Sequence, residues 1–351
     1  MLGCLRTSII LPSHLPQYRF VFTPSYAVWN RHSQRWKRGT VLIHENLHYR
    51  VKTCAASQFP TIAFGTGSTM KFSDVTDYVG QAIENGFSHI DTAQYYQTET
   101  YVGLAIKESG LPRSSLYITT KYSSTGTPQQ AIRQSLNKIG LSYVDMYMVH
   151  VPRALPDLES GWQEFEKMKK DGLTRSIGVS NFTIEDLQQL LKTAVTKPAV
   201  NQIQFHPYNY ASHKALLEYC SKQNIIVEAY GSLNSITQSP GGPVDAVVNA
   251  AARRIGATAN QVIFSWVRSK GVAIVTTSRT KERLQEYLAV EDLPPLTSEE
   301  IAAIDEAGAK GPPSRLLVAK LTMQYRFERA PLLCILLVVA VMFSLILFFT
   351  F

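Results

Sequence analysis

Four side chains able to transfer a proton or stabilise charge stand at or just after the ends of three consecutive apolar segments. They are Asp91, Tyr96, Lys121 and His150. A free tyrosine titrates at about 10, which makes it a poor proton donor at neutral pH. The ammonium of Lys121 would lower that pKa, and Asp91 would keep Lys121 charged and in place. The set is therefore suited to protonating an oxygen that gains negative charge, with His150 orienting that oxygen through a hydrogen bond.

These four residues need elements that bring distant segments to one place. Short, β-branched and largely apolar runs alternate with helical patterns, at 61–66, 87–91, 116–121, 144–150, 175–180, 199–204, 225–230 and 272–277. Runs that are apolar throughout are typical of parallel strands covered on both faces. Eight strands alternating with helices predict an α/β fold, a TIM (β/α)8 barrel, whose strand ends converge on one mouth.

A doubly wound parallel sheet is the alternative, because it also alternates strands and helices. However, no G-x-G-x-x-G motif follows the first strand, where FGTGST offers a single glycine pair. Helix boundaries are indicated by N-cap residues, a capping box and a terminal glycine, namely Ser73, Thr127 before Pro128, Thr183, Thr297 with Glu300, and Gly86.

The segments around the four side chains resemble motifs of the aldo-keto reductase family, in particular its NADPH-dependent carbonyl reductases of fungal type. DTAQYYQTE is similar to the motif with the catalytic aspartate and tyrosine, and ITTK and MYMVHVP are similar to those with the lysine and histidine. The resemblance covers residues 59–309. It implies that an aldehyde or ketone is reduced to an alcohol, with Tyr96 as general acid assisted by Lys121 and Asp91 and with His150 orienting the carbonyl.

Other segments resemble the family's cofactor-binding motifs, which implies NADPH as cofactor, with NADH as the alternative. IGVSN and VNQIQFHP are similar to the segments that hold the nicotinamide carboxamide. EAYGSL is similar to the segment with a ring-stacking tyrosine and a serine near the pyrophosphate, and SRTKERLQEYLAV to the adenosine-phosphate segment. The residues implied are, in that order, Ser180, Asn181 and Gln202; Tyr230 and Ser232; and Ser278, Arg279, Arg283 and Glu286.

The chain departs from the family pattern in two ways. Thr277 stands where the family usually has a lysine that contacts the 2′-phosphate, so Arg283, helped by Arg279, is left to make that contact. Small residues replace frequent pocket tryptophans, which predicts a wider and less aromatic pocket, at Gly67, Ser123 and Val151.

Two other functions are open to the same kind of fold. The fold of this family also serves as a cytosolic cofactor-sensing subunit of potassium channels, so a membrane-associated regulatory subunit with little turnover is one alternative. A Schiff-base aldolase using Lys121 and no nicotinamide is the other. The complete set of four catalytic residues favours the reductase over both.

The net charge of +8 belongs to the N-terminal part of the chain. Residues 1–57 hold eight of the 35 basic and one of the 27 acidic residues, which leaves 27 basic against 26 acidic residues elsewhere. The remaining body therefore has no excess charge for binding nucleic acid. Residues 1–57 are expected to be a disordered arm or, since residues 1–44 contain no acid, a mitochondrial targeting segment. Residues 58–311 are expected to form the barrel.

The cysteines are scattered, and their spacing fits neither a metal site nor a disulfide framework. Cys4, Cys54, Cys220 and Cys334 are therefore expected to be free thiols in a reducing compartment, and no metal is expected. The expected partner is a small-molecule carbonyl substrate, bound by a monomer.

The last twenty residues, 332–351, carry no charge and follow a linker at 312–330. A helix of that length spans roughly the 30 Å hydrocarbon core of a bilayer. Residues 331–351 are therefore expected to form a transmembrane helix that anchors the chain by its tail. Because Arg326 and Arg329 precede the span, the catalytic domain is expected in the cytosol. No positive cluster follows the span, which favours the endoplasmic reticulum over the mitochondrial outer membrane.

Overall fold

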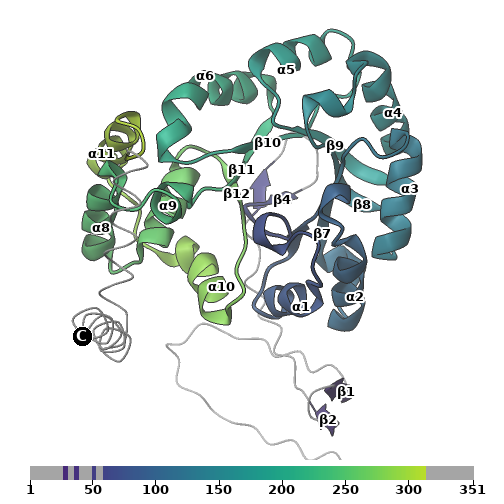
Figure 1. Cartoon of the computed structure of the whole chain (residues 1–351), viewed down its shortest axis with the longest axis horizontal. Helices are drawn as coiled ribbons and strands as arrows, with labels where there is room; N and C mark the ends of the chain where they lie inside the picture. The colour runs from purple at the N-terminus through teal and green to yellow at the C-terminus, as the bar shows by residue number, and fades with distance from the viewer. Residues whose placement is uncertain (1–26, 31–34, 39–49, 53–57, 314–351) are drawn as a thin grey trace, which may run out of the picture. The chain divides into compact units, whose positions relative to one another are not determined.

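The computed structural model describes residues 27–30, 35–38, 50–52 and 58–313. Eight parallel strands close into a barrel in the order β10, β11, β12, β5, β6, β7, β8, β9 (Figure 1). Their bounds are β5 Ile62–Gly65, β6 His89–Asp91, β7 Tyr117–Tyr122, β8 Val144–Val149, β9 Thr174–Ser180, β10 Val200–Gln204, β11 Ile226–Tyr230 and β12 Ala273–Thr276. Each predicted strand matches one of these to within two residues at either end. The predicted TIM barrel is confirmed, and the doubly wound sheet is wrong.

Helices surround this barrel (Figure 1). The α-helices are α1 Thr76–Glu84, α2 Glu99–Ser109, α3 Pro128–Ile139, α4 Leu158–Lys170, α5 Ile184–Leu191, α6 Pro207–Gln223, α7 Asn234–Thr237, α8 Pro243–Ile255, α9 Ala259–Ser269, α10 Lys281–Leu288 and α11 Ser298–Ala309. The short 3-10 helices are η1 Ser68–Met70, η2 Gln94–Tyr96, η3 Arg113–Ser115, η4 Pro152–Ala154 and η5 Ala289–Asp292.

Most of the predicted helix boundaries are confirmed. Thr127, Thr183 and Thr297 each cap a helix through a capping box, in which the N-cap and the third helical residue exchange hydrogen bonds. The prediction of Ser73 as an N-cap is wrong. Its hydroxyl donates backwards to the carbonyl oxygen of Met70, at 2.7 Å. The helix begins later, at Thr76, because the carboxylate of Asp74 accepts the first free backbone N–H.

Two antiparallel strand pairs precede the barrel strands. β1 (Ala27–Asn30) pairs with β2 (Arg35–Arg38), and β3 (Arg50–Lys52) pairs with β4 (Gln58–Pro60). Regular structure therefore occurs within residues 1–57. Phe59 of β4 packs edge-on against His89 and Tyr117, with ring centroids 5.3 and 5.4 Å apart, and so lies near the N-terminal ends of β6 and β7.

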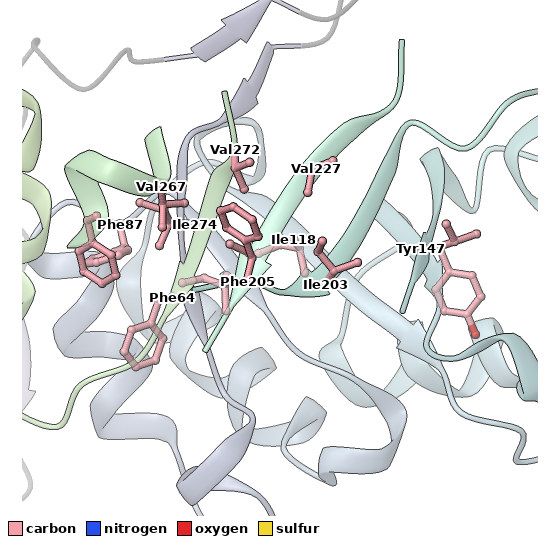
Figure 2. Packing of buried hydrophobic residues seen from close by; sticks show 14 of the residues in the cluster. Phe64, Phe87, Ile118, Tyr147, Ile203, Phe205, Val227, Val267, Val272 and Ile274 are labelled. Atoms are coloured by element: carbon pink, nitrogen blue, oxygen red, sulfur yellow. The ribbon is translucent and has the colours of Figure 1, made fainter. Parts of the chain in front are cut away.

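Alternate strand residues point to opposite sides, so the barrel wall separates an apolar outer layer from the interior. The interior holds the polar side chains of the site and a small apolar cluster that includes Met146, Met148 and Val200. Phe64 and Phe87 meet edge-on outside the wall (Figure 2). Phe205 stacks on Trp266 of α9, with the ring centroids 5.3 Å apart. Asp91 instead bonds to Gln202 of β10, which is not a neighbouring strand. Side chains that reach across the barrel in this way must lie inside it.

In the described part of the chain, no helix combines the length and apolar character needed to cross a bilayer. The predicted span at 331–351 lies outside the described residues.

Two helical glycines give a matched test of this packing. A Cβ on Gly103 of α2 would lie 2.3 Å from the carbonyl oxygen of Ile139 at the end of α3, whereas a Cβ on Gly80 of α1 would meet nothing within 4 Å. Gly103→Ala should lower the free energy of unfolding by about 1–3 kcal/mol through overpacking. Gly80→Ala should raise it by up to about 1 kcal/mol through helix propensity. Urea unfolding measures both, and equal effects would contradict the close contact between α2 and α3.

Candidate active site

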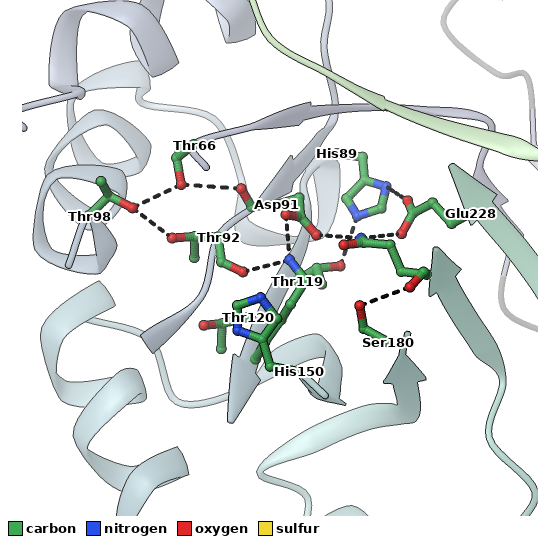
Figure 3. Close-up of polar contacts among 12 residues, drawn as sticks. Thr66, His89, Asp91, Thr92, Thr98, Thr119, Thr120, His150, Ser180 and Glu228 are labelled. Atoms are coloured by element: carbon green, nitrogen blue, oxygen red, sulfur yellow. Dashed lines mark hydrogen bonds and ion pairs between the residues drawn. The ribbon is translucent and has the colours of Figure 1, made fainter. Parts of the chain in front are cut away.

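The centre of the candidate site is a buried ion pair between adjacent strands. Asp91 ends β6, and Lys121 stands one residue before the end of β7. The Nζ of Lys121 donates to Asp91 Oδ1 at 2.5 Å and to the carbonyl oxygen of Thr92 at 3.0 Å (Figure 3). Burial alone would lower the pKa of Lys121, but the charges of Asp91, Tyr96 and Glu228 and the hydrogen bond to Asp91 together raise it. Lys121 is therefore a charged ammonium with no exposure to solvent.

Tyr96 is held beside this ion pair by the short helix η2, which follows β6. Its ring centroid lies 5.3 Å from Lys121 Nζ. A Cβ on Gly67 would lie 2.9 Å from the Cζ and 3.2 Å from the hydroxyl of Tyr96, so the tyrosine needs a glycine at this position. Gly67 therefore does more than leave room in the pocket.

The expected lowering of the Tyr96 pKa is not what the structure gives. Burial raises this pKa and the charge and hydrogen bonding of Lys121 lower it, but with the charges of Asp91 and Tyr230 added to burial the pKa is raised. Lys121 acts in the expected direction but is outweighed. Tyr96 therefore carries its proton at neutral pH, which is the state a general acid requires.

His150, directly after β8, faces Tyr96 with the ring centroids 5.4 Å apart. Its Nδ1 shares a hydrogen bond with the hydroxyl of Ser123, at 2.8 Å. Burial and the charges of Lys121 and Lys71 lower the pKa of His150 to about 3. The ring is thus neutral, and with Nδ1 engaged by Ser123 its Nε2 can carry a hydrogen that is donated to a substrate oxygen.

The ends of β9, β10 and β11 bring the predicted carboxamide-binding residues together. Ser180 donates to the carbonyl oxygen of Gln202 at 2.8 Å, and Asn181 Nδ2 donates to Ser180 Oγ at 3.0 Å. The hydroxyl of Tyr230 donates to Asn181 Oδ1 at 2.8 Å. These four residues form one network that immobilises their side chains.

This network fits a nicotinamide cofactor at two points. The Nε2 of Gln202 donates to Asp91 Oδ2 at 2.9 Å and to Glu228 Oε2 at 2.7 Å, which uses both of its hydrogens. The remaining atom, Oε1, can only accept, and a carboxamide N–H is a suitable donor. The hydroxyl of Ser232 is buried and has no partner in the described part of the chain, so it is available to phosphate oxygens beside Tyr230.

The predicted phosphate segment lies on the loop after β12 and on α10. Ser278 Oγ accepts from the backbone N–H of Thr280 at 3.1 Å. Arg279 donates to the carbonyl oxygen of Thr69 at 2.9 Å, so it joins this loop to the one after β5. Glu286 accepts from Thr258 and Asn260 and thereby supports the start of α9.

The side chains of Arg279 and Glu286 already make hydrogen bonds within the protein. Arg283 is exposed, and its guanidinium has no carboxylate partner within residues 58–313. It is therefore the predicted phosphate ligand whose guanidinium is free to bind an anion.

Three functional contacts were missed in the sequence. Ser123 was interpreted as a small pocket residue, but it bonds to His150. Lys71 lies 5.3 Å from the ring centroid of Tyr96. Glu228 is fully buried beside Gln202. A serine after a strand, a loop lysine and a glutamate within an apolar strand are each common, although a charged residue in the middle of IIVEAY was a detectable signal.

The described residues contain no cluster of three side chains able to hold a metal ion.

Comparison with known proteins identifies the family of this chain. The model of the Aldo/keto reductase family matches residues 61–309. An NAD/NADP-dependent indole-3-acetaldehyde reductase of Schizosaccharomyces pombe is 36% identical, over 72% of this chain and 92% of the relative. An NADPH-dependent alpha-keto amide reductase of Saccharomyces cerevisiae is 32% identical, over 77% of this chain and 94% of the relative.

Solved structures of the same family superpose on this chain. An aldo-keto reductase of Bombyx mori, solved in complex with NADP, superposes with a TM-score of 0.67 at 31% identity, over 74% of this chain and 92% of the other. An aldo/keto reductase of Brucella melitensis gives a TM-score of 0.66 at 30% identity, over 74% and 99%. The matched region contains the whole barrel and every residue of the site, and the chain therefore belongs to the aldo/keto reductase family of oxidoreductases.

Proposed function

We propose that this chain reduces an aldehyde or ketone to an alcohol with NADPH, NADH being the alternative cofactor. One observation carries the proposal: the proton-bearing Tyr96 lies beside the buried Lys121–Asp91 pair and the neutral ring of His150. The two yeast relatives, named as an NAD/NADP-dependent and an NADPH-dependent reductase, support it. A cofactor-binding subunit with little turnover is not favoured, because the proton-donating set is complete.

In this mechanism the residues of the chain stabilise the negative charge that forms on the carbonyl oxygen and donate a proton to it. When bound, the reduced nicotinamide supplies the hydride. The carbonyl oxygen gains negative charge, and His150 Nε2 orients it by donating a hydrogen bond. Tyr96 then gives its phenolic proton to that oxygen. The ammonium of Lys121 stabilises the phenolate left behind, and Asp91 keeps that ammonium in position.

The cofactor would be held by the residues whose contacts fit its parts. Ser180, Asn181 and Gln202 would bind the carboxamide, with Gln202 as acceptor through Oε1. The ring of Tyr230 would pack on the nicotinamide, and Ser232 and Ser278 would bond phosphate oxygens. Arg283 would bind the 2′-phosphate, helped by Arg279 in place of the lysine that Thr277 replaces, while Glu286 would lie near the adenosine. Because one chain supplies all these residues, we propose that it acts as a monomer.

We also propose that residues 331–351 span a membrane and hold the barrel in the cytosol, at the endoplasmic reticulum. The support is the run of twenty uncharged residues at 332–351, preceded by Arg326 and Arg329, which favour the cytosolic side.

Tyr96→Phe removes only the hydroxyl of the proposed acid. NADPH binding should persist, and carbonyl reduction should fall by roughly 10²–10⁴-fold, the usual effect of losing one proton-transfer group. Steady-state kinetics with a panel of aldehydes and ketones, combined with NADPH titration, measures both. The matched control is Tyr95→Phe, which removes a hydroxyl from an exposed neighbour. Near-normal turnover by Tyr96→Phe would show that another group donates the proton.

Arg283→Ala tests the cofactor assignment. Only NADPH carries a 2′-phosphate, so its affinity should fall by about tenfold to a hundredfold while the affinity for NADH stays close to that of the wild type. Fluorescence titration measures both dissociation constants. Arg253→Ala is the control, since Arg253 is exposed on α8. Equal losses for both cofactors would contradict a phosphate contact.

Removal of residues 330–351 tests the membrane proposal. The full chain should resist carbonate extraction and lose its barrel to protease added outside intact vesicles, while the truncated chain should be soluble and still active. Val339→Arg, which places a charge in mid-span, should reduce insertion, because such a charge costs about 2.5 kcal/mol or more. A full chain in the soluble fraction, or a barrel protected from protease, would overturn the proposed topology. Co-fractionation with mitochondria would place it on the other membrane.

A further inference from the structure

A second carboxyl group lies inside the barrel behind the catalytic ion pair. Glu228 of β11 is fully buried, in register with Gln202 of β10. The Nε2 of Gln202 donates one hydrogen to Asp91 Oδ2 at 2.9 Å and the other to Glu228 Oε2 at 2.7 Å (Figure 3). A single amide group therefore joins the catalytic carboxylate to Glu228.

The charges around Glu228 do not balance if both carboxyl groups are ionised. On β12 the residue paired with Glu228 is the apolar Ala273. The polar groups that face Glu228 come from β6, β7 and β10, and they are His89, Asp91, Tyr117, Lys121 and Gln202. Burial and the charge of Lys121 lower the pKa of His89 to about 3, so His89 is neutral. One cation is thus shared by two buried carboxyl groups.

A proton on Glu228 relieves this imbalance. Burial and the charge of Asp91 raise the pKa of Glu228 to about 8, against the hydrogen bond from Gln202 and the charge of Lys121, which lower it. Its second oxygen, Oε1, lies 3.9 Å from Nδ1 of His89 and, like that nitrogen, has no hydrogen-bond partner among the described residues. His89 Nε2 is engaged with Thr119 at 2.8 Å. Oε1 is therefore the oxygen free to carry the proton, while Oε2 accepts from Gln202.

We propose that Glu228 is a positioning residue that acts through Gln202 and through the Asp91–Lys121 pair. As a neutral acid it accepts one hydrogen of the Gln202 amide, which leaves Gln202 Oε1 directed to the cofactor, and it leaves Lys121 with a single carboxylate to balance. When Glu228 ionises, its negative charge strengthens the hold of Lys121 on its proton and makes Tyr96 a weaker acid. Carbonyl reduction should then slow as the pH rises. This inference rests on the proposed reductase function.

The first experiment needs neither cofactor nor activity. A free glutamate has a pKa of about 4.3, and the pKa of Glu228 in the folded protein lies above that value. The protein must therefore lose stability as the pH rises from there through about 8. In Glu228→Gln the amide mimics the neutral acid and cannot ionise. The melting temperature of Glu228→Gln minus that of the wild type should be larger at pH 9 than at pH 5, by at least about 5 °C.

The matched control is Glu99→Gln. Glu99 is a buried carboxyl on α2 that bonds to Thr120 at 2.7 Å and pairs with Lys138 at 3.8 Å, and it makes no contact with Asp91 or Gln202. The melting curves of Glu99→Gln at the two pH values control for the loss of a buried carboxyl that does not contact Gln202. Carbon-13 NMR of glutamate carboxyls in the wild type reports the same proton without a variant, as one resonance that titrates at about pH 8.

The second experiment follows kcat/KM for carbonyl reduction against pH. Wild type and Glu99→Gln should lose activity by about tenfold from pH 6 to pH 9, while Glu228→Gln should match the wild type at pH 6 and keep its activity at pH 9. Glu228→Leu, which offers Gln202 no acceptor, should weaken NADPH binding at every pH in a fluorescence titration.

The outcomes separate the two proposals. A constant melting difference between Glu228→Gln and wild type, with no glutamate titrating near pH 8, would overturn the protonation of Glu228. A low activity of Glu228→Gln at pH 6 as well as at pH 9 would overturn its role in the reaction. If the wild type reduces no carbonyl compound, the reductase function fails, while the melting and NMR experiments still test the proton on Glu228.

Discussion

The burial of a charged lysine inside the barrel is the constraint on which the site depends. An ammonium without access to water is unfavourable unless a carboxylate and further acceptors surround it. Asp91 and the carbonyl oxygen of Thr92 supply these acceptors for Lys121. Both come from the end of β6, so the pair exists only if β6 and β7 are adjacent and in the observed register. Tyr96 lies beside this pair, and the charge of Lys121 adds to burial in keeping the ring of His150 neutral.

A single alternation along the strands produces both the stability of the barrel and its chemistry. Outward residues such as Ile90 and Ile118 pack under the helices, while inward residues such as Asp91 and Lys121 meet in the interior. The result is a polar centre enclosed by an apolar layer, with Phe59 near the N-terminal ends of β6 and β7. This low-dielectric surrounding strengthens the interactions among the few charges inside and makes an unbalanced charge costly.

The strands and the residues of the site could be predicted from the sequence because the signals are local: apolar runs, capping boxes and motifs at strand ends. Properties that depend on the sum of many neighbours could not. The pKa of Tyr96 is set by burial against the charge of Lys121, and their relative size appears only in the folded chain. Ser73 was predicted as a cap from its type alone, although Asp74 next to it is the residue that accepts the helix N–H. The contact of Arg279 with Thr69 joins residues 210 apart in the sequence, and no local pattern signals it.

The contact of Arg279 with Thr69 belongs to the seam where β5 meets β12, which are the first and the last strand of the barrel in chain order. Thr61 bonds to Glu291 across the same seam, over a separation of 230 residues. Contacts between residues so far apart in the sequence form late in folding, because a long loop must close before any of them is made. Until β12 is in place, β5 and β11 are open edges able to pair with other chains. A growing chain on the ribosome therefore carries an unclosed sheet through most of its synthesis, and the barrel becomes safe from aggregation only when its eighth strand has emerged.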